Sequence, residues 1–188
     1  MTDKIIEFVE SAFREMRSDF GILAEVVSFE RWVQIELARR FLKAHDGWRV
    51  ECDSGRSTRP DLLFSCRPEP RRVIELKLLW NNGKFLDTVR KVIDDAKKLE
   101  KLGTGERYVI VFPVFYRGEP DGAPAIYGDN YTPKRLKAKD ENDCAFMNRL
   151  LGEAHEIVSA AGIDLREIDD GRWISGEWCG TMLEGEVK

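Results

Sequence analysis

The chain has 188 residues, of which 43% are hydrophobic and 34% charged, and its net charge is −4 at pH 7. This composition is typical of one soluble globular domain and excludes a disordered chain. The longest uncharged apolar run has nine residues, too short to span a membrane, and the first residues lack a signal-peptide pattern, so we expect a cytoplasmic protein without a membrane partner. The four cysteines form no CxxC pair, so we expect no zinc knuckle.

The first half of the chain predicts two helices followed by three strands. Apolar residues recur at helical spacing over residues 3–17, and Ser28 is a suitable N-cap for a second helix that runs to about His45. Three short extended segments bounded by turn residues follow. They are Trp48–Asp53, Asp61–Cys66 and Arg72–Leu79.

The second half predicts a crossover helix, a buried strand and a smaller C-terminal part. Residues 84–102 have an amphipathic helical pattern, and the continuous apolar run Tyr108–Phe115 suits a strand buried on both faces. A loop rich in proline and glycine follows, over about residues 117–141. The C-terminal part, residues 142–183, comprises a helix at 142–161, a strand at Ile163–Ile168 and a hairpin at 172–183 that turns near Gly176.

This order of elements predicts an α/β fold in a single domain over residues 1–188. Three consecutive strands with short connections favour an antiparallel meander, and a helix between two strands favours a parallel crossover. We therefore expect a central mixed β-sheet flanked by helices.

The most informative residues are a charged pair within the third strand. Glu75 and Lys77 are two residues apart, so both side chains leave the same face of the strand. A carboxylate and an ammonium group among apolar neighbours are unfavourable unless they are paired or bound to a metal. The simpler interpretation of this pair is an ion pair on an edge strand.

A second carboxylate, Asp61, opens the preceding strand. If the two strands pair antiparallel, Asp61 can lie near Glu75, and a divalent cation would relieve the repulsion between the two acids. Mg²⁺ prefers oxygen ligands and leaves coordination sites for water and a substrate phosphate. The backbone carbonyl of Leu76, between the two charged side chains, could be a further ligand.

The second helix carries a third carboxylate, Glu36, on the same arc as its apolar residues and Arg40. Glu36 either belongs to the metal site or forms an ordinary i,i+4 salt bridge with Arg40. Glu30 also lies near this arc, but an acid in the first turn of a helix is expected simply to complement the helix dipole.

Together, Pro60-Asp61 and Glu75-Leu76-Lys77 resemble the motif of the PD-(D/E)XK nuclease superfamily, which has the restriction-endonuclease-like fold. The resemblance covers roughly residues 28–115 and implies an αβββαβ core. The motif is short and degenerate, so its weight comes from the predicted strands that carry it and the helices on either side.

The resemblance implies an endonuclease that hydrolyses phosphodiester bonds, above all in DNA, with Mg²⁺ as the cofactor and Mn²⁺ as a substitute. Asp61, Glu75 and Glu36 would be the metal ligands. Lys77 would orient or help to activate the attacking water and would stabilise the charge that develops on the phosphate.

Basic residues near these motifs are candidates for contacts with nucleic acid. Arg56 and Arg59 precede the first acidic motif and either clamp a phosphate or form an ordinary exposed turn. Lys84 and Lys91 lie on the basic face of the helix after the third strand, which either contacts DNA or is solvated surface. In the family resembled, a polar residue of this helix often points into the active site, and Thr88 or Lys91 could take that place.

Charge is distributed unevenly along the chain. Residues 1–139 carry 26 Lys and Arg against 22 Asp and Glu, whereas residues 140–188 carry 4 against 12. Either the basic part meets a polyanion while the acidic part faces away, or the charges are a scattered solvated surface. Two cuts on a duplex would suit a homodimer. The alternative function is a noncatalytic nucleic-acid-binding or protein-interaction module that retains the nuclease fold.

Overall fold

The structure is a computed structural model that describes residues 5–20, 29–52, 60–102, 105–118 and 137–187. The helices are α1 (Ile5–Met16), the 3-10 helix η1 (Arg17–Asp19), α3 (Phe29–Ala44), α4 (Phe85–Glu100) and α5 (Asp143–Ala160). The strands are β1 (Arg49–Cys52), β2 (Leu62–Ser65), β3 (Arg72–Trp80), β4 (Glu106–Tyr116), β5 (Arg166–Glu167), β6 (Trp173–Ser175), β7 (Trp178–Gly180) and β8 (Leu183–Glu186).

The strands form one mixed sheet in the order β1-β2-β3-β4-β7-β6, and β8 pairs with both β4 and β5. Strands β1, β2 and β3 make an antiparallel meander. Strands β3 and β4 are parallel because α4 carries the chain back between them. The predicted α/β class and the mixed sheet flanked by helices are therefore confirmed.

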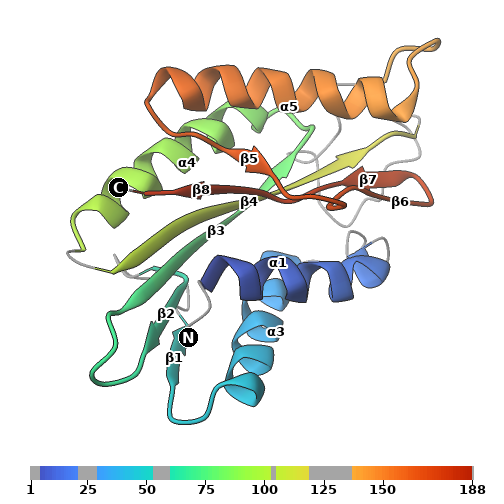
Figure 1. Cartoon of the computed structure of the whole chain (residues 1–188). Coiled ribbons are helices and arrows are strands. Elements are labelled where there is room, and N and C mark those ends of the chain that lie inside the picture. Colours follow the sequence, from blue (N-terminus) through green and yellow to red (C-terminus); the bar gives the residue numbers. More distant parts are fainter. Residues whose placement is uncertain (1–4, 21–28, 53–59, 103–104, 119–136, 188) are drawn as a thin grey trace.

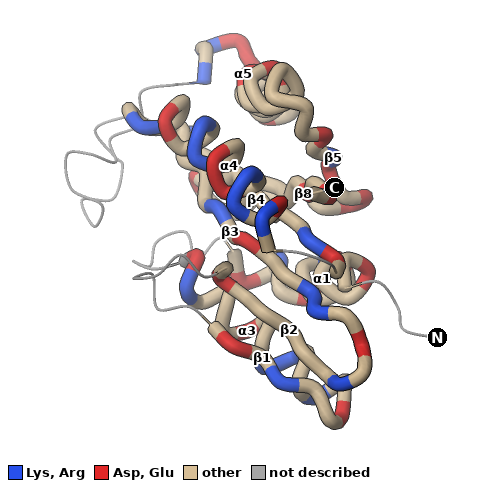
Figure 2. Tube along the Cα trace, turned by 90° about the vertical axis from the view of Figure 1, so that its left-hand side faces the viewer, with Lys and Arg blue, Asp and Glu red and all other residues tan. Residues whose placement is uncertain are grey.

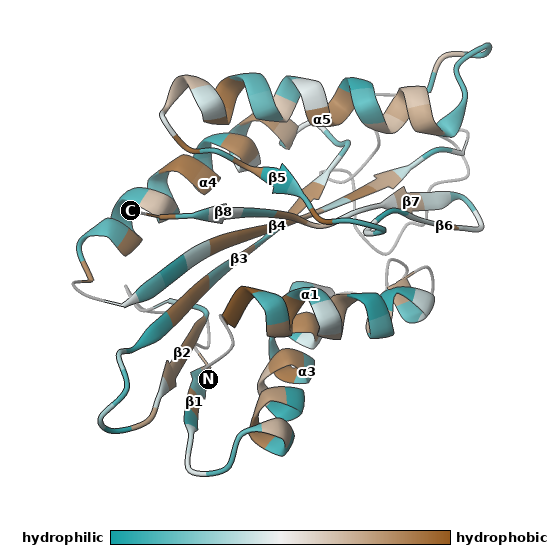
Figure 3. Ribbon diagram, in the orientation of Figure 1, coloured by the Kyte–Doolittle hydropathy of each residue, from teal (hydrophilic) through white to brown (hydrophobic). Residues whose placement is uncertain are grey.

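Helices cover both faces of the sheet (Figure 1). Helices α4 and α5 lie on one face, and α1 and α3 lie on the other. Hydrophobic and hydrophilic residues alternate along these helices (Figure 3), and each helix contributes buried apolar side chains to the core, such as Val9, Leu37, Val92 and Leu150.

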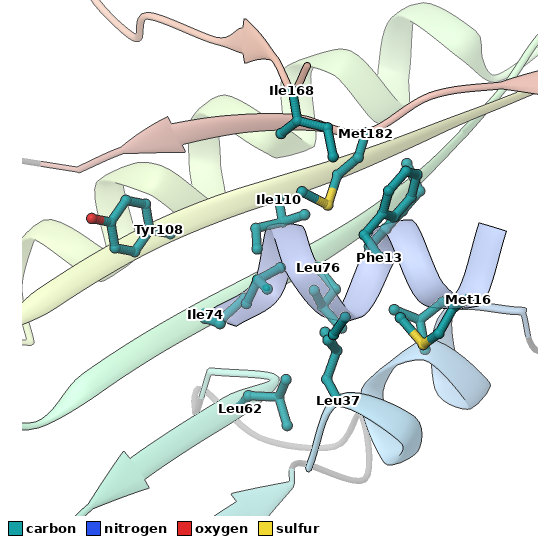
Figure 4. Close-up of a cluster of buried hydrophobic side chains, with 14 of the residues drawn as sticks. Phe13, Met16, Leu37, Leu62, Ile74, Leu76, Tyr108, Ile110, Ile168 and Met182 are labelled. Carbon is teal, nitrogen blue, oxygen red and sulfur yellow. The ribbon is translucent and has the colours of Figure 1, made fainter. Parts of the chain in front are cut away.

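The core has two parts, separated by the sheet. Strand β4 contributes to both, because successive side chains of a strand point to opposite faces. Ile110 packs on the side of α1 and α3 with residues such as Phe13 and Leu37 (Figure 4), whereas Val109 and Val111 pack on the side of α4 and α5. The prediction that this strand is buried on both faces is confirmed.

The C-terminal part differs from the prediction in its strands. The hairpin forms from β6 and β7 and turns at Gly176, whose φ of 55° suits glycine. The strand predicted at Ile163–Ile168 is reduced to Arg166–Glu167, and an unpredicted strand, Leu183–Glu186, pairs with the middle of β4. Its sequence holds two glutamates and a glycine, so it lacks the β-branched pattern by which strands are usually found.

Two other predictions meet the limits of the described residues. Most of the loop predicted at about 117–141 lies outside them, as does Ser28. Within the described part of the chain, the search for a helix with the length and hydropathy of a membrane span found none.

Candidate functional site

Glu75 and Lys77 leave β3 on the face that α4 covers. Their neighbours Ile74 and Leu76 belong to the core on the opposite face, as the alternation of a strand requires. The side chains of Glu75 and Lys77 are 14% and 18% exposed, and the Lys77 Nζ lies 3.3 Å from the Glu75 Oε1. The predicted shared face is thus confirmed, and the ion pair of the simpler interpretation is present, although β3 lies between β2 and β4 and is not an edge strand.

Asp61 lies next to Glu75 across the two strands. In the antiparallel register Leu62 is opposite Ile74, which places Asp61, one residue earlier, opposite Glu75. The Asp61 N–H donates to the Glu75 Oε2 over 3.3 Å. Strands β2 and β3 are antiparallel, as expected, and the structure therefore brings Asp61 and Glu75 together.

Strand β2 begins beside Ile74, and none of the described strands pairs with this edge of β3 beyond that point. Two carboxylates accept the N–H groups at this edge. Leu76 N–H donates to the Asp61 Oδ2 over 2.8 Å, and Leu78 N–H donates to the Glu30 Oε2 over 3.0 Å. Asp61 and Glu30 thus satisfy two backbone donors of β3 that no described strand pairs with.

The acid that α3 contributes is Glu30, and the assignment of Glu36 is not supported by the geometry. Gln34, one turn after Glu30, donates to the Asp61 carbonyl, so this face of α3 is turned toward the site. Glu36 is two residues further, about 200° around the helix. There it accepts hydrogen bonds from Arg39 and Arg40. These hydrogen bonds, above all the one from Arg39, lower the pKa of Glu36 to about 2.

The apolar arc alone placed Glu36 at the site, and the structure does not bring Glu36 to the other acids. The face of α3 that is buried is rotated from that arc, and Glu30 and Gln34 lie on the buried face whereas Glu36 does not. Glu30 in the first turn fits the helix dipole, as expected, but its carboxylate also contacts β3. The alternative interpretation of Glu36, a salt bridge with Arg40, is confirmed at 2.8 Å.

Helix α4 adds an acid that sequence reasoning missed. Asp95 is only 4% exposed, and its Oδ2 lies 2.9 Å from the Lys77 Nζ. Asp95 is four residues after Lys91 and seven after Thr88, so it shares their helix face. We expected Thr88 or Lys91 to point into the site from this face of the helix, and the side chain of this face that contacts Lys77 is Asp95.

The four acids influence one another electrostatically. Burial, followed by repulsion from Asp61, raises the pKa of Glu75 to about 7. Burial also raises the pKa of Glu30, although the charge of Lys77 opposes the shift. For Lys77, burial works against the charged form, but the hydrogen bond to Asp95 and the surrounding acids outweigh it and raise the pKa. The cluster therefore has more negative charge than Lys77 alone can balance.

The donor chemistry fits a small, hard divalent cation. Asp61, Glu75, Glu30 and the Leu76 carbonyl offer only oxygen atoms, which Mg²⁺ prefers. Among the described residues, no three Asp, Glu, His or Cys side chains are arranged to hold a metal ion as they stand. The Lys77 Nζ instead lies against the Glu75 Oε1 and 3.2 Å from the Leu76 carbonyl oxygen.

The predicted nucleic-acid contacts are only partly within the described residues. Lys84 and Lys91 are exposed at α4, along which basic and acidic residues alternate (Figure 2). Arg56 and Arg59 lie outside the described residues. The contact of these four residues with DNA stays a prediction.

Comparisons of the chain with protein-family models, with curated proteins and with solved structures found no match. A function is therefore argued from the topology and from the acidic cluster, which we define as Glu30, Asp61, Glu75 and Asp95 around Lys77.

Proposed function

We propose that the protein is a Mg²⁺-dependent nuclease that hydrolyses phosphodiester bonds, above all in DNA. The observation that carries this proposal is the convergence of Asp61, Glu75 and Lys77 at the open edge of β3. The Asp61 N–H donates to the Glu75 Oε2 over 3.3 Å, and the ammonium group of Lys77 lies 3.3 Å from the Glu75 Oε1. A small cluster with surplus carboxylates and one amine suits a phosphate-bound cation.

The topology supports the resemblance to the PD-(D/E)XK superfamily. A helix, an antiparallel three-stranded meander, a crossover helix and a parallel strand follow one another in the order expected of its αβββαβ core. Asp61 lies directly before the second strand of this meander and Glu75 lies on the third, as the resemblance implies. We infer on this basis that residues 29–116 form a restriction-endonuclease-like core.

Three acids of the cluster and Lys77 have roles in this proposal. Asp61, Glu75 and the Leu76 carbonyl would hold the cation, with Glu30 as the carboxylate from the preceding helix. Bound Mg²⁺ would lower the pKa of its water and neutralise charge on the phosphate. Lys77 would orient the attacking water and stabilise the charge that develops on the phosphate oxygens.

DNA would approach along α4, where Lys84 and Lys91 are exposed beside the face that carries Asp95. Lysine ammonium groups attract phosphates without reading sequence. Two copies of the chain would place two such sites on a duplex, so a homodimer belongs to this proposal.

One observation favours the noncatalytic alternative. Asp61 and Glu30 each accept a backbone N–H of the open β3 edge, and this role alone could explain two of the four acids. It does not explain why Glu75 and Asp95 are buried beside them. A binding module would keep the edge contacts and would not need a cation.

A cleavage assay with matched variants distinguishes the two functions. Supercoiled plasmid, circular single-stranded DNA and RNA are incubated with the protein in Mg²⁺, Mn²⁺ or EDTA. We expect metal-dependent nicking by the wild type, loss of at least 100-fold in Asp61→Asn, and no change in Asp94→Asn, which alters an exposed acid of α4. DNA binding without cleavage in either metal would instead establish the noncatalytic module.

A further inference from the structure

Lys77 has contacts with three oxygen atoms, and the shortest is with Asp95. The Lys77 Nζ lies 2.9 Å from the Asp95 Oδ2, 3.2 Å from the Leu76 carbonyl oxygen and 3.3 Å from the Glu75 Oε1. The last two oxygens are also those that the proposed function assigns to the cation. Lys77 and the cation would therefore compete for them unless another group holds the ammonium.

Asp95 is built to be that group. Its side chain is 5% exposed, and a buried carboxylate is unfavourable unless cations satisfy it. One oxygen accepts from Lys77 on the inner side, and the other accepts from Lys98, which is 62% exposed and one turn further along α4. The two contacts fix the direction of the carboxylate from both sides.

The element that carries Asp95 is itself fixed to the sheet. Val92, Ala96 and Leu99 of α4 are buried in the core between α4, α5 and the strands. Asp95 thus projects from a packed helix, and side chains on such elements hold a partner more accurately than side chains on loops. Lys77 projects from β3 toward it across the same interface.

We propose that Asp95 is a positioning residue that retains Lys77 at the border of the acidic cluster when a divalent cation takes up Glu75 and the Leu76 carbonyl. This inference rests on the proposed function. Without Asp95, the contacts left to the ammonium group of Lys77 are the same two oxygens. Lys77 would then occupy the cation's place and would also lie too far inward to meet the attacking water.

The proposal predicts that Asp95 and Lys77 are coupled in cation binding. Mn²⁺ alone is titrated by calorimetry into the wild type, Asp95→Asn, Lys77→Met and the double variant. Lys77→Met should change the Kd for Mn²⁺ less than threefold in the wild-type background, because Asp95 would retain the amine when the cation takes up the two oxygens. In the Asp95→Asn background the same change should tighten binding at least tenfold.

Simple charge effects predict a different result. If Asp95 and Lys77 act only through their charges, Lys77→Met changes the Kd by the same factor in both backgrounds. Such additivity would overturn the proposal. A loss of Mn²⁺ affinity in Asp95→Asn that Lys77→Met does not reverse would also overturn it, because Asp95 would then be a metal ligand itself. Absence of Mn²⁺ binding by the wild type would overturn the metal centre and this inference with it.

Cleavage gives a second readout. At saturating Mn²⁺, Asp95→Asn should lower kcat at least tenfold and change KM less than threefold, whereas Asp94→Asn should change neither. A loss confined to KM would contradict a role in positioning Lys77. Thermal unfolding checks that each variant is folded. If Asp95→Asn does not fold, Lys98→Met is used in its place, because it removes the outer partner of Asp95. Lys98→Met should also lower kcat with little change in KM, by a smaller factor.

Discussion

At the scale of single residues, Lys77 acts as an internal cation for the cluster. It lies within hydrogen-bond distance of Glu75 and Asp95, and both are largely buried. Removal of one partner from a buried ion pair leaves the other charge buried without compensation. This destabilises the fold by more than the intact pair stabilises it. The stability of the fold should therefore depend on Lys77 and on any cation that replaces it.

Substitution of Lys77 by methionine tests this dependence. Lys77→Met should lower the free energy of unfolding on the order of 3 kcal/mol in EDTA, since Glu75 loses its cation and Asp95 keeps only Lys98. Mg²⁺ should restore part of this loss, while cleavage should stay absent. Lys97→Met, at an exposed position on another side of α4, is the control for urea unfolding and cleavage, and equal behaviour of the two variants would count against the account.

The pKa of Glu75 gives a prediction for pH. Burial and then Asp61 raise it from 4.5 to about 7 in the folded state. The folded chain therefore binds more protons than the unfolded chain between these values, so the contribution of Glu75 to stability is favourable near pH 4.5 and declines as the pH rises to 7. The loss should be about 2 to 3 kcal/mol.

Urea unfolding in EDTA at pH 5 and pH 8 measures this loss. The stability of Glu75→Gln relative to the wild type should increase by about that amount between the two pH values, because the amide does not ionise. Glu51→Gln, at an exposed position of β1, should keep a constant difference. A difference for Glu75→Gln that is flat, or that decreases with pH, would contradict the raised pKa.

At the scale of elements, the strands of the site were easier to predict than its helices. Alternation within β3 placed Glu75 and Lys77 on one face, and a short connection to β2 was enough to bring Asp61 opposite Glu75. The rotation of a helix about its own axis depends on packing with several partners. That rotation decides that Glu30, not Glu36, meets the edge of β3, and it is not encoded in the apolar arc.

Two substitutions on α3 test this choice of acid. Glu30→Gln keeps an acceptor for the Leu78 N–H but removes the charge, so Mn²⁺ affinity should fall at least tenfold. Glu36→Gln weakens the pairs with Arg39 and Arg40, which as partly exposed pairs contribute about 1 kcal/mol or less. Calorimetry should show unchanged Mn²⁺ affinity for Glu36→Gln, and the reverse ranking of the two variants would restore the original assignment.

At the scale of the whole molecule, the order of elements and the mixed sheet could be predicted because each major element has a strong local pattern. The buried strand β4 is the clearest case, with a continuous apolar run that is buried on both faces. Strand β8 could not be predicted, because its place beside β4 depends on pairing with residues some seventy positions earlier rather than on its own sequence. Asp95 was missed for a similar reason, since only the packing of α4 on β3 gives it a partner.

The most direct measurement of the central claim is a crystal structure of the protein grown with Mn²⁺, with the ion located by its anomalous scattering. We expect an ion in direct coordination with carboxylate oxygens of Asp61 and Glu75, and the Lys77 ammonium retained by Asp95. A structure in which Lys77 still contacts Glu75 and the Leu76 carbonyl, with no ion at the edge of β3, would contradict it.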